Sequence, residues 1–340
     1  MKKTVCVVLA LIMIFSLSIT ALASEDTLSE YIPILVAYGY TEETAEALPA
    51  DIQERLAKKL LEDPDSVDIA TLTLETDLLS EIEAFFLFSE EELIDMGADP
   101  DAVKRTKVEL LSYYSMSNSE LAKTLGIDTV EAALIKEAIC SGQIHAGNKD
   151  YRNKKTGVSA SGSITTSEMT YTQTAENNST PTAPSYDVSI TYAWKEVYSL
   201  AVFDDKIVAA WGGGLNSKNI SSCARYYNWS TVGGSFGSYY TYKTMNKTET
   251  VQSALEFEFP QSVNNPNVIN MPKTKSGYVN FTLYQTQKQG YDTKVLSNYC
   301  HKVISVGGGS ISVDVSGPSV GLEIGYGYDT NVQYESTISY

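Results

Sequence analysis

Two hydrophobic periodicities divide this chain. Between residues 28 and 140 the apolar residues recur at three- and four-residue spacing, which indicates amphipathic helices. Capping boxes mark two of the helix starts, at Ser89 with Glu92 and at Ser117 with Glu120. The pattern predicts helices over 28–38, 41–61, 76–88, 89–96, 100–115, 117–125 and 128–140.

From residue 186 to the C-terminus, apolar and polar residues alternate instead, which is typical of half-buried strands. In 277–286, for example, Val279, Phe281 and Leu283 share one face. Short strands at this spacing favour an antiparallel β-sandwich, with a single barrel as the alternative. The predicted strands are 187–199, 206–211, 222–229, 237–246, 250–259, 277–286, 292–306, 310–316, 319–327 and 331–339.

The two patterns predict an α+β protein, in which an N-terminal all-α helical-hairpin domain precedes a C-terminal antiparallel β-sandwich. We expect an acidic all-α domain over 24–145, a polar linker over 146–185 and an aromatic-rich β domain over 186–340. The linker is rich in Ser, Thr, Asn and Pro, although 163–174 alternates enough for an edge strand. The composition break predicts that 186–340 folds by itself.

The first 23 residues are typical of a cleaved signal peptide. Lys2 and Lys3 precede an apolar run shorter than a membrane span, and Ala21 and Ala23 supply the small residues of a cleavage site. We therefore expect a secreted protein that is extracellular or loosely associated with the cell surface.

Charge is distributed unevenly between the halves. Residues 25–150 contain 28 Asp and Glu against 9 Lys and Arg, whereas 151–340 contain 14 of each kind. Residues 119–139, with Leu121, Gly126 and Ile127, resemble a DNA-binding helix-turn-helix. Nucleic-acid binding requires a cationic surface, however, so the acidic half excludes a nucleic-acid partner.

Aromatic residues concentrate in the β half, which holds 16 of the 23 tyrosines and all three tryptophans. Trp194 and Trp211 are expected in the core, while Trp229 suits either the core or the surface. Neighbouring strand residues point to opposite faces, so adjacent tyrosines cannot all be buried on one side. The predicted ligand-binding residues, which crowd one glycine-rich stretch, are Tyr226, Tyr227, Trp229, Tyr239, Tyr240 and Tyr242.

Three cysteines remain after signal cleavage, an odd number for an oxidising compartment. Cys223 and Cys300 share the β half, so a disulfide between them is the simplest pairing. Cys140 is then either a buried helix-end thiol or an intermolecular link.

No catalytic, metal-binding or cofactor motif stands out. The two histidines are too few for a three-histidine zinc site, and His301 lies beside Cys300 in one strand, where neighbours point apart. Glu256 and Glu258 share a strand face as glycosidase carboxylates do, but any half-buried strand shows this pattern. We expect no enzymatic activity, no cofactor and no metal.

These observations favour a secreted, non-enzymatic binding or surface-interaction protein, whose β domain engages a glycan or a protein through aromatic side chains. One alternative is a membrane-acting, pore-forming β toxin, because 310–340 alternates small polar with apolar residues. Membrane contact is therefore possible but not favoured. The other alternative is an unrecognised secreted hydrolase.

Overall fold

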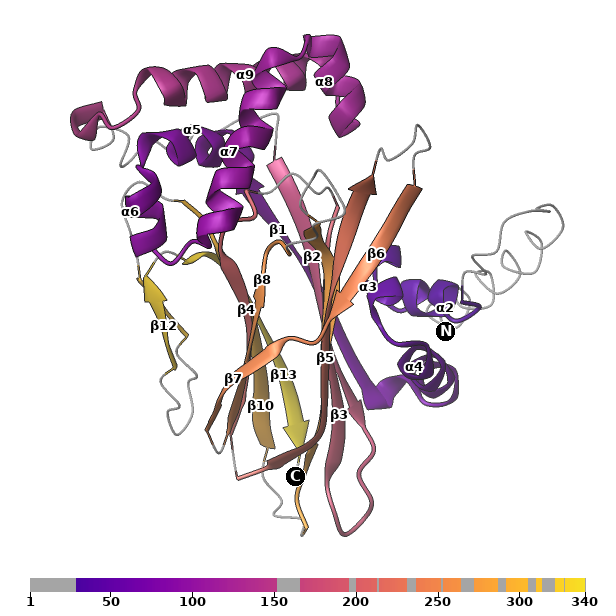
Figure 1. The fold of residues 1–340 in the computed structure, drawn as a ribbon. Coiled ribbons are helices and arrows are strands. Elements are labelled where there is room, and N and C mark those ends of the chain that lie inside the picture. The colour runs from indigo at the N-terminus through magenta and orange to yellow at the C-terminus, as the bar shows by residue number, and fades with distance from the viewer. Residues whose placement is uncertain are drawn as a thin grey trace, which may run out of the picture.

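The computed structural model describes residues 29–151, 166–195, 200–212, 214–230, 237–251, 253–263, 272–286, 292–304, 310–313, 322–326 and 328–339. The predicted signal peptide, residues 1–23, and residues 152–165 of the predicted linker lie outside the described part. The described residues form an α+β structure with antiparallel sheets, which confirms the predicted fold class (Figure 1).

The first helical unit comprises α2 (Ile32–Ala37), α3 (Glu42–Ala47) and α4 (Ala50–Glu62), followed by the short 3-10 helix η1 (Pro64–Ser66). Thr41 caps α3 by accepting a hydrogen bond from the Thr44 amide. Apolar residues one turn apart then form a small core that includes Leu35 and Leu56. This core continues into Val67 and Ile69 of the following strand, so the unit is packed against a sheet.

The second helical unit contains α5 (Leu78–Leu87), α6 (Glu90–Asp95), α7 (Pro100–Ser115), α8 (Asn118–Leu125) and α9 (Thr129–Ile144). Both predicted capping boxes are present: Ser89 caps α6 with Glu92, and Ser117 caps α8 with Glu120. Gly126 ends α8 in the left-handed conformation, at φ 73°. The local rules of helix initiation and termination thus account for these helices.

One element departs from the predicted all-α domain of 24–145. Residues 67–77 form strand β1 (Val67–Asp77), which pairs antiparallel with β2 (Thr166–Asn177), a strand inside the predicted linker 146–185. The β-branched and apolar residues Val67, Ile69 and Thr71 suit a strand, but its partner lies about a hundred residues away. The acidic half therefore contributes an edge strand to the sheet of the β half.

The strands form two main antiparallel sheets. The first has the order β1-β2-β3-β9-β5-β6 and the second the order β13-β10-β4-β8-β7, while β11 and β12 form a separate pair. The remaining bounds are β3 (Ser185–Trp194), β4 (Asp204–Trp211), β5 (Asn216–Ser230), β6 (Gly237–Lys243), β7 (Asn246–Val251), β8 (Ala254–Pro260), β9 (Lys273–Tyr284), β10 (Asp292–Lys302), β11 (Ser310–Val313), β12 (Leu322–Tyr326) and β13 (Tyr328–Ser339).

The inner faces of the two main sheets share one aromatic core. Trp194 and Trp211 are both about 1% exposed, as expected from the sequence. Ring contacts join the sheets: the Tyr192 and Phe259 ring centroids are 5.2 Å apart, and those of Trp211 and Phe281 are 5.6 Å apart. The predicted β-sandwich is therefore the observed arrangement.

The second helical unit lies across one end of the sandwich (Figure 1). Its apolar core includes Val202 and Phe203, which precede β4. The Asp99 amide donates to the Val202 carbonyl at 2.9 Å, and Lys302 Nζ donates to the Met96 carbonyl at 2.6 Å. The helices are therefore held against the sheets by both apolar and polar contacts.

A carboxylate, Asp205, is fully buried inside the sandwich. It accepts hydrogen bonds from Tyr299 Oη at 2.6 Å, His301 Nδ1 at 3.0 Å, Gln261 Nε2 at 2.6 Å and the Lys302 amide at 3.1 Å. Burial of a charged group is costly unless it is compensated by such donors. This cluster joins β4, β10 and the residue that follows β8.

We predict that Asp205→Asn lowers the free energy of unfolding by about 3 kcal/mol or more, because the amide cannot accept from all of these donors. The adjacent Asp204 is exposed, so Asp204→Asn should change it by less than about 0.5 kcal/mol. Urea unfolding followed by tryptophan fluorescence measures both. Equal stabilities of the two variants would contradict this role.

A fragment of residues 186–340 should not unfold cooperatively, contrary to the expectation from composition. It lacks β1 and β2, so the hydrogen-bonding edge of β3 is exposed and Met169 and Tyr171 are lost from the core. Near-ultraviolet circular dichroism of the fragment, beside the full chain, tests this. A sharp thermal transition in the fragment would restore the independent β domain.

Candidate functional site

Cross-strand pairing on β5 and β6 gathers several of the predicted ligand-binding tyrosines on one face. Tyr227 lies opposite Tyr240, and Arg225 lies opposite Tyr242. Directly opposed residues of an antiparallel pair share a face, and the alternate β5 residues Ala224 and Tyr226 belong to the inner core. We call Arg225, Tyr227, Tyr240 and Tyr242 the aromatic patch; it lies on the outer face of the six-stranded sheet.

Within the aromatic patch the side chains contact one another. The Tyr227 and Tyr240 ring centroids are 5.5 Å apart with the planes tilted by 57°, and the Arg225 guanidinium carbon lies 4.4 Å from the Tyr240 ring centroid. Tyr240 is 38% exposed and Tyr242 is 64% exposed. Cation–π and ring contacts therefore hold Tyr240 in place while solvent still reaches it.

Glu46 of α3 borders the aromatic patch. Its Oε2 atom lies 3.9 Å from Arg225 Nη2, at the limit of an ion pair. Burial raises the pKa of the Glu46 carboxyl, although Arg225 partly offsets this effect. Arg225 thus faces both a ring and a carboxylate, and it could not be singled out before the strand register was known.

Tyr226 does not belong to the aromatic patch, contrary to the sequence prediction. Its side chain is fully buried, and Oη donates a hydrogen bond to the Pro260 carbonyl at 2.8 Å. Burial raises the pKa of this phenol. The alternation of the strand explains the difference: with Tyr227 outside, Tyr226 must point inward. The side chains of Trp229 and Tyr239 lie outside the described part of the structure.

The first helical unit packs beside the aromatic patch and, among the described residues, leaves it open. Helix α3 contacts β2, β3 and β9, and Tyr40 Oη hydrogen-bonds with Thr174 Oγ1 at 2.5 Å. Arg55 of α4 completes the docking through ion pairs with Glu176 at 3.3 Å and Asp187 at 3.1 Å. Strand β6 is the edge of the sheet and lies beyond this cover.

The carboxylates considered for catalysis are engaged elsewhere. Lys206 Nζ lies 2.7 Å from Glu256 Oε1 and 3.8 Å from Glu258 Oε1, so one ammonium bridges both. The ring of His301 is buried beside Asp205, and its centroid lies 4.9 Å from that of Trp194. The two glutamates thus contact a lysine of the neighbouring strand, and His301 contacts side chains of the core.

The predicted Cys223–Cys300 disulfide is not formed. Both thiols are free, as is Cys140. Cys223 precedes the core-facing Ala224, and Cys300 follows the core-facing Tyr299. Because neighbouring strand residues point to opposite faces, the two cysteines lie on the outer faces of different sheets. Packed sheets are about 10 Å apart, which separates the two cysteines beyond the reach of a disulfide.

Thiol labelling should distinguish the cysteines. Burial, with Asp205 and Glu256 nearby, raises the pKa of Cys300 to about 12, so about one thiol in ten thousand is ionised at pH 8. Iodoacetamide should therefore modify Cys140 and Cys223, which are partly exposed, and spare Cys300 until the protein is denatured. Mass spectrometry of non-reduced peptides shows which cysteines are alkylated. A pair of peptides linked by a Cys223–Cys300 disulfide would contradict the prediction.

No three His, Cys, Asp or Glu side chains in the described ranges are grouped as metal ligands. No helix of the described chain is long and apolar enough to cross a membrane. In the segment considered for a membrane hairpin, β13 pairs with β10 of the main sheet, while β11 and β12 pair with each other.

Comparison with known proteins gives no family assignment. No family model matches the chain, and no curated protein matches it. Among solved structures, a collagen-binding domain from a Staphylococcus aureus adhesin is similar over 49% of this chain and 95% of its own, with 10% identity and a TM-score of 0.23. A protein described as AvmM, which catalyses macrocyclization in alchivemycin A biosynthesis, covers 46% of this chain and 80% of its own, with 8% identity and a TM-score of 0.18.

Proposed function

We propose that this is an exported, non-enzymatic binding protein that contacts a protein partner through the aromatic patch. The observation that carries the proposal is the exposure of Tyr240 and Tyr242 beside Arg225 on an edge of the sandwich. Tyrosine and arginine are among the residues that contribute most to binding energy at protein interfaces. Rings and a guanidinium already held by mutual contacts lose little conformational entropy on binding.

The ring geometry favours a protein over a glycan. A sugar stacks on a flat, open ring face, whereas Tyr227 and Tyr240 are tilted by 57° and Arg225 lies over Tyr240. The neighbouring edge of β6 offers backbone groups to which an extended polypeptide segment can pair. An extended segment would then place its side chains between the tyrosines, which gives both affinity and specificity.

We predict that Tyr240→Ala with Tyr242→Ala raises the Kd for a protein partner at least tenfold, because truncated interface aromatics commonly cost about 2 kcal/mol. The measurement is surface plasmon resonance against immobilised extracellular-matrix proteins, beside a glycan array. Both residues are exposed, so circular dichroism should not change, and the loss of the Tyr240 contacts with Arg225 and Tyr227 should lower the melting temperature by only about 2–4 °C.

The matched control is Tyr114→Ala with Val108→Ala, which removes two exposed apolar side chains from α7 and should leave binding unchanged. Binding to glycans alone, lost in the double tyrosine variant, would replace the protein partner by a glycan. Full-strength binding by that variant would remove the aromatic patch from the function.

A further inference from the structure

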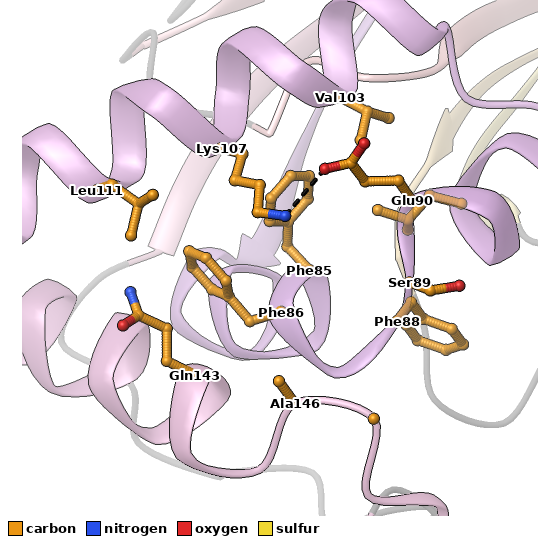
Figure 2. A pocket seen from close by; sticks show the side chains of 12 residues that line it. Phe85, Phe86, Phe88, Ser89, Glu90, Val103, Lys107, Leu111, Gln143 and Ala146 are labelled. Atoms are coloured by element: carbon orange, nitrogen blue, oxygen red, sulfur yellow. Dashed lines mark hydrogen bonds and ion pairs between the residues drawn. The ribbon is translucent and has the colours of Figure 1, made fainter.

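A cavity of about 430 Å³ lies inside the second helical unit, between α5, α7 and α9 and the start of α6 (Figure 2). Its walls are largely apolar, with Phe85 and Phe86 from α5 and Val103 and Leu111 from α7. The volume is within the range of small-molecule sites, about 300–1,000 Å³. The cavity shares no lining residue with the aromatic patch.

Close helix packing places the cavity walls. At Gly142 of α9, an added Cβ would lie 2.7 Å from the Glu83 carbonyl and 2.9 Å from Phe86 Cβ, so only glycine permits this approach of α9 to α5. The Phe85 and Phe86 rings meet edge to face, with centroids 5.4 Å apart. Phe86 and the next residue of α9, Gln143, are thereby brought to the same cavity.

The cavity has few polar groups, and they differ in whether they have a hydrogen-bond partner. Lys107 Nζ and Glu90 Oε1 form an ion pair at 2.9 Å along one wall, and this contact holds the pKa of Glu90 below its usual range (Figure 2). Gln143 Nε2 is buried and has no hydrogen-bond partner among the described residues. A buried donor without an acceptor is costly, and a rotation of the Gln143 side chain toward the cavity would let a bound acceptor remove that cost.

The charges around the cavity argue against an ionic ligand. Lys107 and Glu90 already neutralise each other, and the acidic half to which the cavity belongs, residues 25–150, contains 28 acidic residues against 9 basic ones. An anion would be repelled by the surrounding carboxylates, and a cation would have to compete with Lys107 for Glu90. An uncharged molecule avoids both penalties.

We infer that this cavity binds an uncharged amphipathic small molecule, whose ring or short acyl body contacts Phe85 and Phe86 and whose carbonyl oxygen accepts a hydrogen bond from Gln143 Nε2. The phenylalanine rings supply apolar contact area, and the single donor orients the ligand. This inference is independent of the partner proposed for the aromatic patch.

Nile red, an uncharged aromatic dye with a carbonyl acceptor, is a suitable probe for the full chain. We expect saturable one-to-one binding in the micromolar range by fluorescence titration. Gln143→Leu, which keeps the volume but removes the donor, should raise the Kd about tenfold. Leu111→Trp changes a 42% exposed position of the wall and should block the cavity. Ile144→Ala changes the 73% exposed residue that follows Gln143, and this variant should bind the dye like the wild type.

Absence of saturable binding in the wild type, or unchanged binding in Leu111→Trp, would overturn the site. If Leu111→Trp weakens binding while a folded Gln143→Leu does not, the assigned hydrogen bond is wrong. Equal cavity-dependent affinity for the anionic dye 1-anilinonaphthalene-8-sulfonate would overturn the preference for an uncharged ligand. Circular dichroism of each variant confirms folding, and Leu111→Trp provides the test if Gln143→Leu does not fold.

Discussion

The buried carboxylate of Asp205 is the constraint on which the sandwich depends. Its four hydrogen-bond donors come from Tyr299, His301, Gln261 and the Lys302 amide, so a single charged group fixes the ends of β4 and β10 and the chain after β8. Trp194 Nε1 then donates to Tyr299 Oη at 3.4 Å and extends the cluster to the opposite sheet. Because each member satisfies another, the register of these strands is strongly specified.

This fixed end of the sandwich is also where the second helical unit docks. Lys302 follows the Asp205 cluster and reaches the Met96 carbonyl, and Phe203 lies in the apolar core of the helices. The first helical unit covers the outer face over β2, β3 and β9 instead (Figure 1). The helices therefore cover one end and part of one outer face of the sandwich, and no described helix covers the outer face over β5 and β6.

The two proposed sites use different physical chemistry. The aromatic patch is a solvated surface in which Arg225 and tyrosine rings support one another, and it suits a large partner that excludes water on contact. The helical cavity is mainly apolar and partly open to solvent, with one buried donor at Gln143, and it suits a small ligand.

The sequence by itself determined the fold class and most local elements, though not strand β1, because capping residues such as Ser89 and Ser117 and the alternation in β9 act over a few positions. It also located the aromatic segment that holds Tyr240. Only the tertiary structure decided which tyrosines face outward, that Arg225 lies among them, that β1 joins β2, and that Cys223 and Cys300 lie on different sheets. Alternation defines relative faces but not which one is buried, and pairing between distant strands depends on contacts that no local pattern encodes.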